Sequence, residues 1–396
     1  MLDHPLTELY NILYCFARET SRLSKLNAKK NKRSGVVVCG AYGMGNAGDE
    51  AILEAIIAEL RSIDADMAIT ILSRTPETVG KKFGVNAIHM FDIPAFLRAV
   101  SSARLYVNGG GSLIQDVTSS RSLWYYLFTI AAAKRFGSRV MMYGCGIGPV
   151  SRRMNRRLVR RVLSRNVDAV TLREASSAAE LEEYGVSGPE VVLSADPVFA
   201  LAAHADPEAA KAVDSMGVVD GGKYIGFCVR RWPGYEEKAE CFARAADYAC
   251  TKYGLTPVFI PINYPGDAKA ASLAASKLGC DALEIQQQMP TDVTAETIRR
   301  MSIVVSVRLH GLIFAATQSV PVVGVSYDPK VTAFLEYIGQ DNFTTLEKVT
   351  DEMLCAMIDK AAAADPEALR VAAQRLRETE NRNTEVARSL YEEGYR

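Results

Sequence analysis

The fold class is predicted by the stretch GVVVCGAYGMGNAGDEAILEAIIAEL, residues 35–60. It opens with a short apolar run, passes through a glycine-rich loop at 43–48, and continues with apolar residues at helical spacing. A strand, a glycine loop and a helix in this order form the repeating unit of an α/β domain with a parallel sheet.

The same alternation continues along the chain, interrupted by a polar, small-residue segment at 200–221. Further strands are expected at 67–74, 103–111, 138–148 and 168–174, then from about 222 to 232, and at 256–265, 302–311 and 320–329. We therefore predict an α/β protein with two doubly wound, Rossmann-like domains facing a cleft. Its parts are an N-terminal extension (1–34), an N-terminal domain (35–205), a C-terminal domain (215–345) and C-terminal helices (346–396).

Composition excludes several classes of function. The 396 residues include 46 basic and 46 acidic side chains, whereas a nucleic-acid-binding protein usually carries a basic excess. The eight cysteines form no CxxC pair, and no group of His, Cys and carboxylates has metal-ligand spacing, so we expect no metal and reduced thiols. No apolar stretch reaches about 18 residues, and the first residues lack the order of a signal peptide, so a cytoplasmic location is expected.

Three glycine clusters are expected at strand ends, at 43–48, 108–112 and 144–149. Ligands of such sheets gather at the carboxyl ends of the strands, so these clusters suggest a backbone-lined floor for a ligand. The first matches G-x-G-x-x-G, which in dinucleotide sites binds a pyrophosphate. The next strand, however, ends in Ser73-Arg74 rather than in the acid that a nicotinamide cofactor requires, and a plain turn stays possible.

Several segments in order resemble the polysaccharide pyruvyl transferases, particularly the branch that acts on secondary cell wall polymers. They are GAYGMGNAGDEAIL (40–53), NGGGSLIQD (108–116), GCGIGPV (144–150), ADPVFAL (195–201), VRRWPG (229–234) and SVRLHGLIFAATQSVPVVGVSYDPKVTAFL (306–335). The resemblance covers about residues 35–345. It implies a fold like that of GT-B glycosyltransferases. It also implies transfer of pyruvate from phosphoenolpyruvate to a sugar of a cell-surface polysaccharide precursor, as a ketal, with release of phosphate.

This chemistry defines the residue types that the site needs. Phosphoenolpyruvate carries a carboxylate and a phosphate, which cations bind, and ketal formation needs a general acid to protonate the methylene carbon. With the resemblance, His310, Lys330 and Arg173 are the expected catalytic residues, and Arg308, Arg173, Lys330 and Gly311 the expected donor-binding residues.

Structural roles are the alternatives for these residues. His310 could be a buried structural histidine, Lys330 a solvated charge after a proline turn, and Arg173 the ion-pair partner of Glu174. Arg308 and His310 are two residues apart, so on an extended strand their side chains would share one face.

A second group of residues is expected to line the cleft or bind the acceptor. These residues are Gly43, Gly45, Asn46, Asp49, Gly110, Gly111, Asp116, Arg230, Asn263 and Asp328. The aspartates are equally suited to capping helices, and Asn263 to a turn. The chain departs from the family pattern in its N-terminal extension and in Arg230-Arg231-Trp232, where related proteins tend to have Arg-Pro-Trp.

The segment SRRMNRRLVRRVLSR (151–165) holds seven arginines and an apolar stripe at helical spacing. It predicts a surface helix with a solvated basic face or, alternatively, a helix that contacts anionic lipid headgroups. The expected partners are phosphoenolpyruvate and a glycan or lipid-linked sugar acceptor, and the second alternative for this helix adds peripheral contact with the inner membrane face. Neither a nucleic acid nor a cofactor is expected.

Two other functions fit the same architecture. A nucleotide-sugar-dependent glycosyltransferase or epimerase would use the same fold with a different donor. A non-catalytic binding protein would not need Arg173, Arg308, His310 and Lys330 together.

Overall fold

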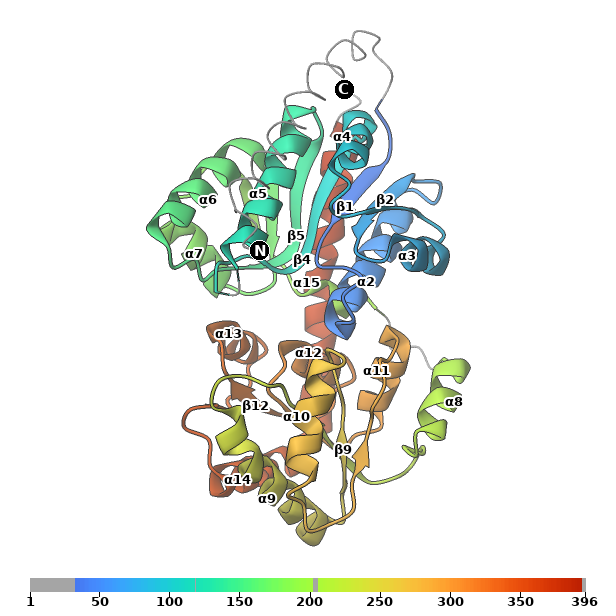
Figure 1. Ribbon diagram of the computed structural model, residues 1–396, viewed down its shortest axis with the longest axis vertical. Coiled ribbons are helices and arrows are strands. Elements are labelled where there is room, and N and C mark those ends of the chain that lie inside the picture. The colour runs from blue at the N-terminus through green and yellow to red at the C-terminus, as the bar shows by residue number, and fades with distance from the viewer. Residues whose placement is uncertain (1–32, 118, 202–205, 394–396) are drawn as a thin grey trace, which may run out of the picture.

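The computed structural model describes residues 33–117, 119–201 and 206–393. Almost all of the predicted N-terminal extension, including Cys15 and the basic segment at 25–33 except Arg33, lies outside the described residues. The described chain folds around two parallel sheets, one above the other in Figure 1.

The first sheet has seven parallel strands in the order β3-β2-β1-β4-β5-β6-β7. The bounds are β1 Val36–Cys39, β2 Ile69–Ser73, β3 Asn86–His89, β4 Leu105–Ile114, β5 Arg139–Ile147, β6 Ala169–Leu172 and β7 Glu190–Leu193. The second sheet has six parallel strands in the order β10-β9-β8-β11-β12-β13. These strands are β8 Tyr224–Cys228, β9 Thr256–Phe259, β10 Leu283–Glu284, β11 Ile303–Ser306, β12 Val322–Ser326 and β13 Phe343–Thr345.

Helices cover both faces of each sheet, as the alternating sequence pattern predicts. On the outer face of the first sheet are α4 (Ile93–Ser102), α5 (Ser120–Arg135), α6 (Arg153–Asn166) and α7 (Ser176–Glu183). On the outer face of the second are α9 (Tyr235–Tyr253), α10 (Gly266–Ala275) and α14 (Asp351–Ala362). The helices of the shared inner core are α2 (Ala47–Ile63), α3 (Pro76–Phe83), η1 (Pro197–Ala200), α8 (Pro207–Ser215), α11 (Thr291–Arg299), α12 (Leu309–Thr317), α13 (Pro329–Tyr337) and α15 (Pro366–Glu392).

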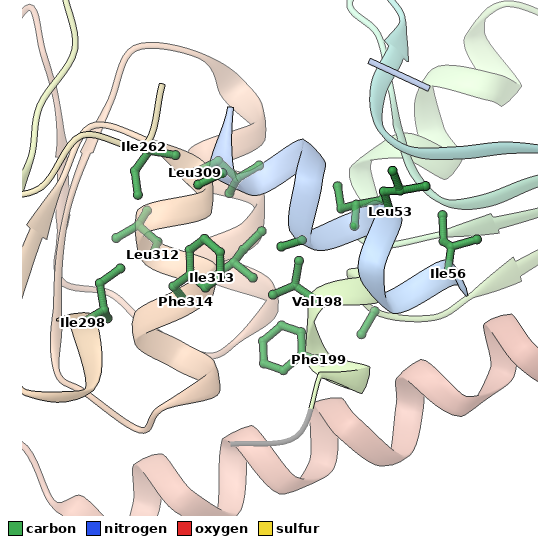
Figure 2. Close-up of a cluster of buried hydrophobic side chains, with 14 of the residues drawn as sticks. Leu53, Ile56, Val198, Phe199, Ile262, Ile298, Leu309, Leu312, Ile313 and Phe314 are labelled. Carbon is green, nitrogen blue, oxygen red and sulfur yellow. The ribbon is translucent and has the colours of Figure 1, made fainter. Parts of the chain in front are cut away.

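One hydrophobic cluster joins the two sheets. Figure 2 shows Leu53 of α2 and Phe199 of η1 on one side, with Leu312 and Phe314 of α12 on the other. All four side chains are almost completely buried. Because apolar burial is favourable in proportion to the area removed from water, this shared core holds α2 and α12 in fixed relative positions.

The last long helix, α15, returns to the first sheet after the second is complete (Figure 1). Its Thr384 hydroxyl lies 3.1 Å from the hydroxyl of Tyr143 in β5, and Asn383 Nδ2 donates to the carbonyl of Ala195 over 3.1 Å. Helix α15 therefore ties the second half of the chain to the first.

Four strands are absent from the sequence prediction: β3, β7, β10 and β13. All four are edge strands that are short and partly exposed; β3, β10 and β13 have no continuous apolar run, and that of β7 is only three residues long, 191–193. The seven cysteines in the described residues are all free. No described helix is long and apolar enough to cross a membrane.

Candidate functional site

Two helix N-termini, one from each half of the chain, meet at Gly48 and His310. Gly48 lies in the first turn of α2 and His310 in the first turn of α12. A Cβ on residue 48 would lie 2.1 Å from the imidazole Cγ and 2.2 Å from Nδ1. Any side chain at position 48 would collide with the ring, so glycine there is a requirement of this contact.

Backbone hydrogen bonds fix the same interface. The amide of Ala47 donates to the carbonyl of Ile262 over 2.8 Å, and the amide of Tyr264 donates to the carbonyl of Gly45 over 3.2 Å. Between them, Asn46 and Asn263 form an isolated antiparallel bridge. The glycine loop before α2 and the loop after β9 are therefore paired edge to edge, which places Gly45, Asn46 and Asn263 together.

Three N–H groups of the glycine loop have hydrogen-bond partners within the protein. The Gly43 amide donates to Glu50 Oε1 over 2.6 Å, the Gly48 amide to Asn46 Oδ1 over 3.1 Å, and the Ala47 amide to Ile262. Gly43 and Gly45 have φ of +76° and +75°, which favours glycine. The loop thus joins the two halves of the chain, and three of the N–H groups that a dinucleotide site would offer to the pyrophosphate are occupied.

His310 lies in a positively charged environment. Burial and the charges of Arg173, Lys330 and Arg308 lower the pKa of His310 to about 3. Its Nε2 atom is buried without a hydrogen-bond partner in the structure. The imidazole is therefore neutral at pH 7, and an unpaired ring nitrogen is available for a ligand.

The prediction that Arg308 and His310 share one face of an extended strand was wrong. Strand β11 ends at Ser306, and α12 begins at Leu309. The Ser306 hydroxyl accepts a hydrogen bond from the Arg308 amide over 3.1 Å and turns the chain into the helix. His310 consequently lies at a helix start rather than on a strand.

Asp49 follows Gly48 directly and belongs to the same cluster. Its Oδ2 accepts a hydrogen bond from Asn46 Nδ2 over 2.6 Å, and its Oδ1 would lie 3.5 Å from a Cβ on Gly111. Burial, together with the negative charge of Glu50, raises the pKa of Asp49 to about 7, although the charge of Arg173 opposes this shift. Asp49 can therefore both accept and release a proton near neutral pH.

Arg173 is one of the most buried cations of the protein. Its Nε donates to Glu174 Oε2 over 2.8 Å, its Nη1 to Asp196 Oδ2 over 3.0 Å and its Nη2 to Ser112 Oγ over 3.1 Å. Burial alone would lower the pKa of Arg173, but the two carboxylates raise it above its ordinary value. The predicted pairing with Glu174 is present, and the charge of Arg173 still acts on His310 and Asp49.

Arg308 and Lys330 each have a carboxylate partner. Both Nε and Nη2 of Arg308 donate to Asp267, the first over 2.9 Å, in a bidentate pair. Lys330 Nζ lies 3.3 Å from Asp328 Oδ2, and Asp328 also caps α13 by accepting from the Lys330 amide. The acids that pair with Arg308 and Lys330 thus lie at the starts of α10 and α13.

Gly110, Gly311 and Asp116 have contacts that position the surrounding helices. A Cβ on Gly110 would lie 2.1 Å from Ile52 of α2, and one on Gly311 would lie 2.4 Å from the hydroxyl of Ser306. Asp116 accepts hydrogen bonds from the amides of Ser151 and Arg152, over 2.7 and 3.1 Å, at the start of α6. Each of these residues allows or fixes a close approach between a helix and a strand.

Sequence analysis did not single out Gly48 or Asp267 as site residues, although both contact predicted ones. Gly48 is the last glycine of the G-x-G-x-x-G loop, so the motif contained the signal. Asp267 follows Pro265-Gly266, where an acid is usually a turn or cap residue. Within the described residues, no group of His, Cys, Asp and Glu is placed to hold a metal ion.

The buried, neutral state of His310 predicts a pH-dependent loss of stability. An unfolded histidine takes up a proton below its ordinary pKa of about 6.5, whereas His310 in the folded protein does so only near 3. The free energy of unfolding should therefore fall as the pH is lowered from 6.5 to 3. In urea titrations across this range, His310→Gln should lose less stability than wild type, by an amount on the order of a few kcal/mol.

His89, which is exposed at the end of β3, provides the matched control. His89→Gln should follow the wild-type curve. If His310→Gln also followed it, the environment described for His310 would be wrong.

Comparisons with known proteins agree with this architecture. Solved structures with a similar fold include a Listeria monocytogenes protein assigned as a UDP-N-acetylglucosamine 2-epimerase (TM-score 0.61, 13% identity, covering 91% of this chain and 97% of that one). Another is the UDP-GlcNAc 2-epimerase of Methanocaldococcus jannaschii (TM-score 0.59, 11% identity, covering 83% and 93%). A third is Anabaena HepE in complex with UDP and glucose (TM-score 0.56, 10% identity, covering 91% and 98%). At these identities the likeness concerns the fold alone, which is the two-domain Rossmann-like fold of GT-B enzymes.

No curated protein matches the chain. The polysaccharide pyruvyl transferase family model matches residues 46–329, a range that begins in the glycine loop at Asn46 and ends just before Lys330. It includes Asp49, Arg173, Arg308 and His310, whose arrangement is described above. The chain belongs to the polysaccharide pyruvyl transferase family.

Proposed function

We propose that the protein transfers the pyruvyl group of phosphoenolpyruvate to a sugar of a cell-surface polysaccharide precursor as a ketal, with release of phosphate. Family membership supports a pyruvyl transferase. The observation that carries the choice of donor is the cationic surrounding of His310, which is formed by Arg173, Arg308 and Lys330. Arginine and lysine side chains bind the phosphate and the carboxylate that such a donor carries.

Donor binding would convert His310 into an acid. In the free protein the pKa of His310 is about 3, because burial and the nearby cations disfavour the imidazolium. Anionic groups placed beside the ring offset these charges and raise the pKa, so binding is coupled to proton uptake. His310 then holds a proton close to the methylene carbon only when the donor is present.

The reaction that follows balances with two proton carriers. His310 gives its proton to C3 of phosphoenolpyruvate while one sugar hydroxyl attacks C2 and passes its proton to Asp49. The bond between C2 and the phosphate oxygen then breaks, and the phosphate leaves with the proton that Asp49 holds. A second hydroxyl attacks C2 to close the ketal, and its proton returns to His310. A group with a pKa of about 7, as Asp49 has, is suited to this exchange.

We propose a cytoplasmic location and a membrane-associated acceptor for this reaction. Helix α6 supports the proposal: Met154 is 80% exposed and Leu158 37% exposed, among the exposed residues Arg157 and Arg161. In the described part of the chain, Arg156 is the α6 arginine that forms an ion pair, with Glu183. Exposed apolar side chains among unpaired arginines suit a surface of anionic lipid headgroups, where a lipid-linked sugar is presented.

The test of function is phosphate release from phosphoenolpyruvate with a panel of lipid-linked and synthetic sugar acceptors. Wild type should release phosphate only when a suitable acceptor is present. His310→Ala should reduce kcat/KM by about 10²- to 10⁴-fold, because the general acid is lost. His89→Ala, on an exposed strand end, should leave the rate unchanged.

A second pair of variants tests the position of the ring. Gly48→Ala places a methyl group within 2.1 Å of His310 and should lower activity strongly, whereas Gly266→Ala enters open space and should not. Acceptor-dependent release that survives in His310→Ala would contradict the proposed role. Consumption of a nucleotide sugar, with phosphoenolpyruvate unused, would instead identify the enzyme as a glycosyltransferase or epimerase.

The lipid contact is tested by sedimentation with vesicles of phosphatidylglycerol and phosphatidylcholine. Reversing two charges in Arg157→Glu/Arg161→Glu should weaken binding by at least about tenfold, since each basic residue near an anionic surface contributes about 1 kcal/mol. Arg98→Glu/Arg388→Glu makes the same charge change at exposed sites on α4 and α15 and should bind as wild type does. Equal binding by both double variants would contradict the assignment of α6.

A further inference from the structure

Arg230 differs from the other cations near the strand ends. Arg173 forms ion pairs with Glu174 and Asp196. Arg308 pairs with Asp267, and Lys330 pairs with Asp328. Among the described residues, no carboxylate forms an ion pair with Arg230. Its Nε atom is buried and has no hydrogen-bond partner.

Two aromatic rings hold the Arg230 side chain in place. The guanidinium carbon lies 4.7 Å from the ring centre of Trp232 and 4.5 Å from that of Tyr327. Nη1 also donates to the Tyr327 hydroxyl. The rings contribute cation–π attraction and restrict the side chain, but they carry no net charge to neutralise the guanidinium. Because Arg230 packs against the rings of Trp232 and Tyr327, the ring faces that contact it are not available to stack on a sugar.

Arg230 lies at the carboxyl-terminal ends of the strands of the second sheet, as Arg308 and Lys330 do. It follows β8, and β8, β11 and β12 are neighbours in the second sheet. Arg308 follows β11 and Tyr327 follows β12, so the three residues extend from the carboxyl ends of adjacent parallel strands. Burial and the charge of Arg308 lower the pKa of Arg230, while Tyr327 and the Asp267 carboxylate act in the opposite direction.

From these observations we propose that Arg230 is the anchor for a phosphate group. A planar guanidinium with a fixed orientation and an unused N–H is suited to bidentate binding of an oxyanion. The phosphate has two possible sources, the donor phosphoenolpyruvate and the phosphate of a lipid-linked acceptor. The inference rests on the proposed function for the identity of these ligands, whereas the binding of phosphate itself requires no turnover.

The first measurement is calorimetric binding of inorganic phosphate and of phosphoenolpyruvate, each without acceptor. Arg230→Gln should weaken binding of both by about 10- to 100-fold if the donor phosphate occupies the site, because a charge-assisted hydrogen bond contributes about 1.5–3 kcal/mol. Arg230→Lys keeps the charge but loses the planar fork, and its affinity should fall between those of wild type and Arg230→Gln.

Arg231 supplies the matched control, since its side chain is 70% exposed and pairs with Glu236. Arg231→Gln should bind phosphate and phosphoenolpyruvate as wild type does. Tyr327→Phe keeps the ring and removes the hydroxyl that accepts from Arg230, so it should weaken binding less than Arg230→Gln does. Thermal unfolding of each variant identifies any loss of the native fold.

The source of the phosphate is distinguished by turnover. If the acceptor phosphate occupies the site, Arg230→Gln should leave phosphoenolpyruvate binding unchanged and raise KM for a phosphorylated acceptor, but not for the same sugar without phosphate. The proposal is overturned if Arg230→Gln folds and has wild-type affinity for phosphate and phosphoenolpyruvate and a wild-type KM for the phosphorylated acceptor. In that case, pyruvyl transfer by the wild-type protein would still support the proposed function. If wild type neither binds nor consumes phosphoenolpyruvate, the proposed function fails instead.

Discussion

The contact between Gly48 and the ring of His310 is the constraint on which the site depends. It requires that residue 48 have no side chain and that two helices from different sheets meet at their first turns. The shared hydrophobic core between α2, η1 and α12 holds the helices at this distance, and the paired loops at Asn46 and Asn263 fix their ends. The packing at this interface also determines the protonation of His310, because burial lowers the pKa of the imidazole and keeps it neutral.

The cations around this contact act on His310 although each of them pairs with an acid. Arg173 and Arg308 are balanced by buried or partly buried acids, which make them rigid without removing their effect on His310. An anionic ligand beside the ring would offset the positive field at His310 and would itself be attracted by these cations. A donor with two anionic groups would therefore be attracted to the site, and its binding would raise the pKa of His310 so that the imidazole carries the proton that the reaction needs.

Sequence reasoning predicted the central strands of both sheets and most residues that gather near His310. The central strands were recognisable because they are buried on both faces and appear as apolar runs, as in VVVC (36–39) and IVVS (303–306). Edge strands such as β3 lacked this signal. Ion pairs between residues distant in sequence could not be predicted, and Asp267 is 41 residues from Arg308. The two residues meet because β9 and β11 flank β8 in the sheet, so the segments that follow β9 and β11 lie at the same end of it.

The proton transferred to the methylene carbon can be traced with deuterium. When wild type converts phosphoenolpyruvate and acceptor in D₂O, the account predicts a pyruvate ketal whose methyl group contains one deuterium, because the methylene carbon keeps its two hydrogens and receives a third from an exchangeable acid. Mass spectrometry and proton NMR of the purified product measure this directly. A ketal without deuterium, or a product that carries a transferred sugar and no pyruvate, would contradict the central claim.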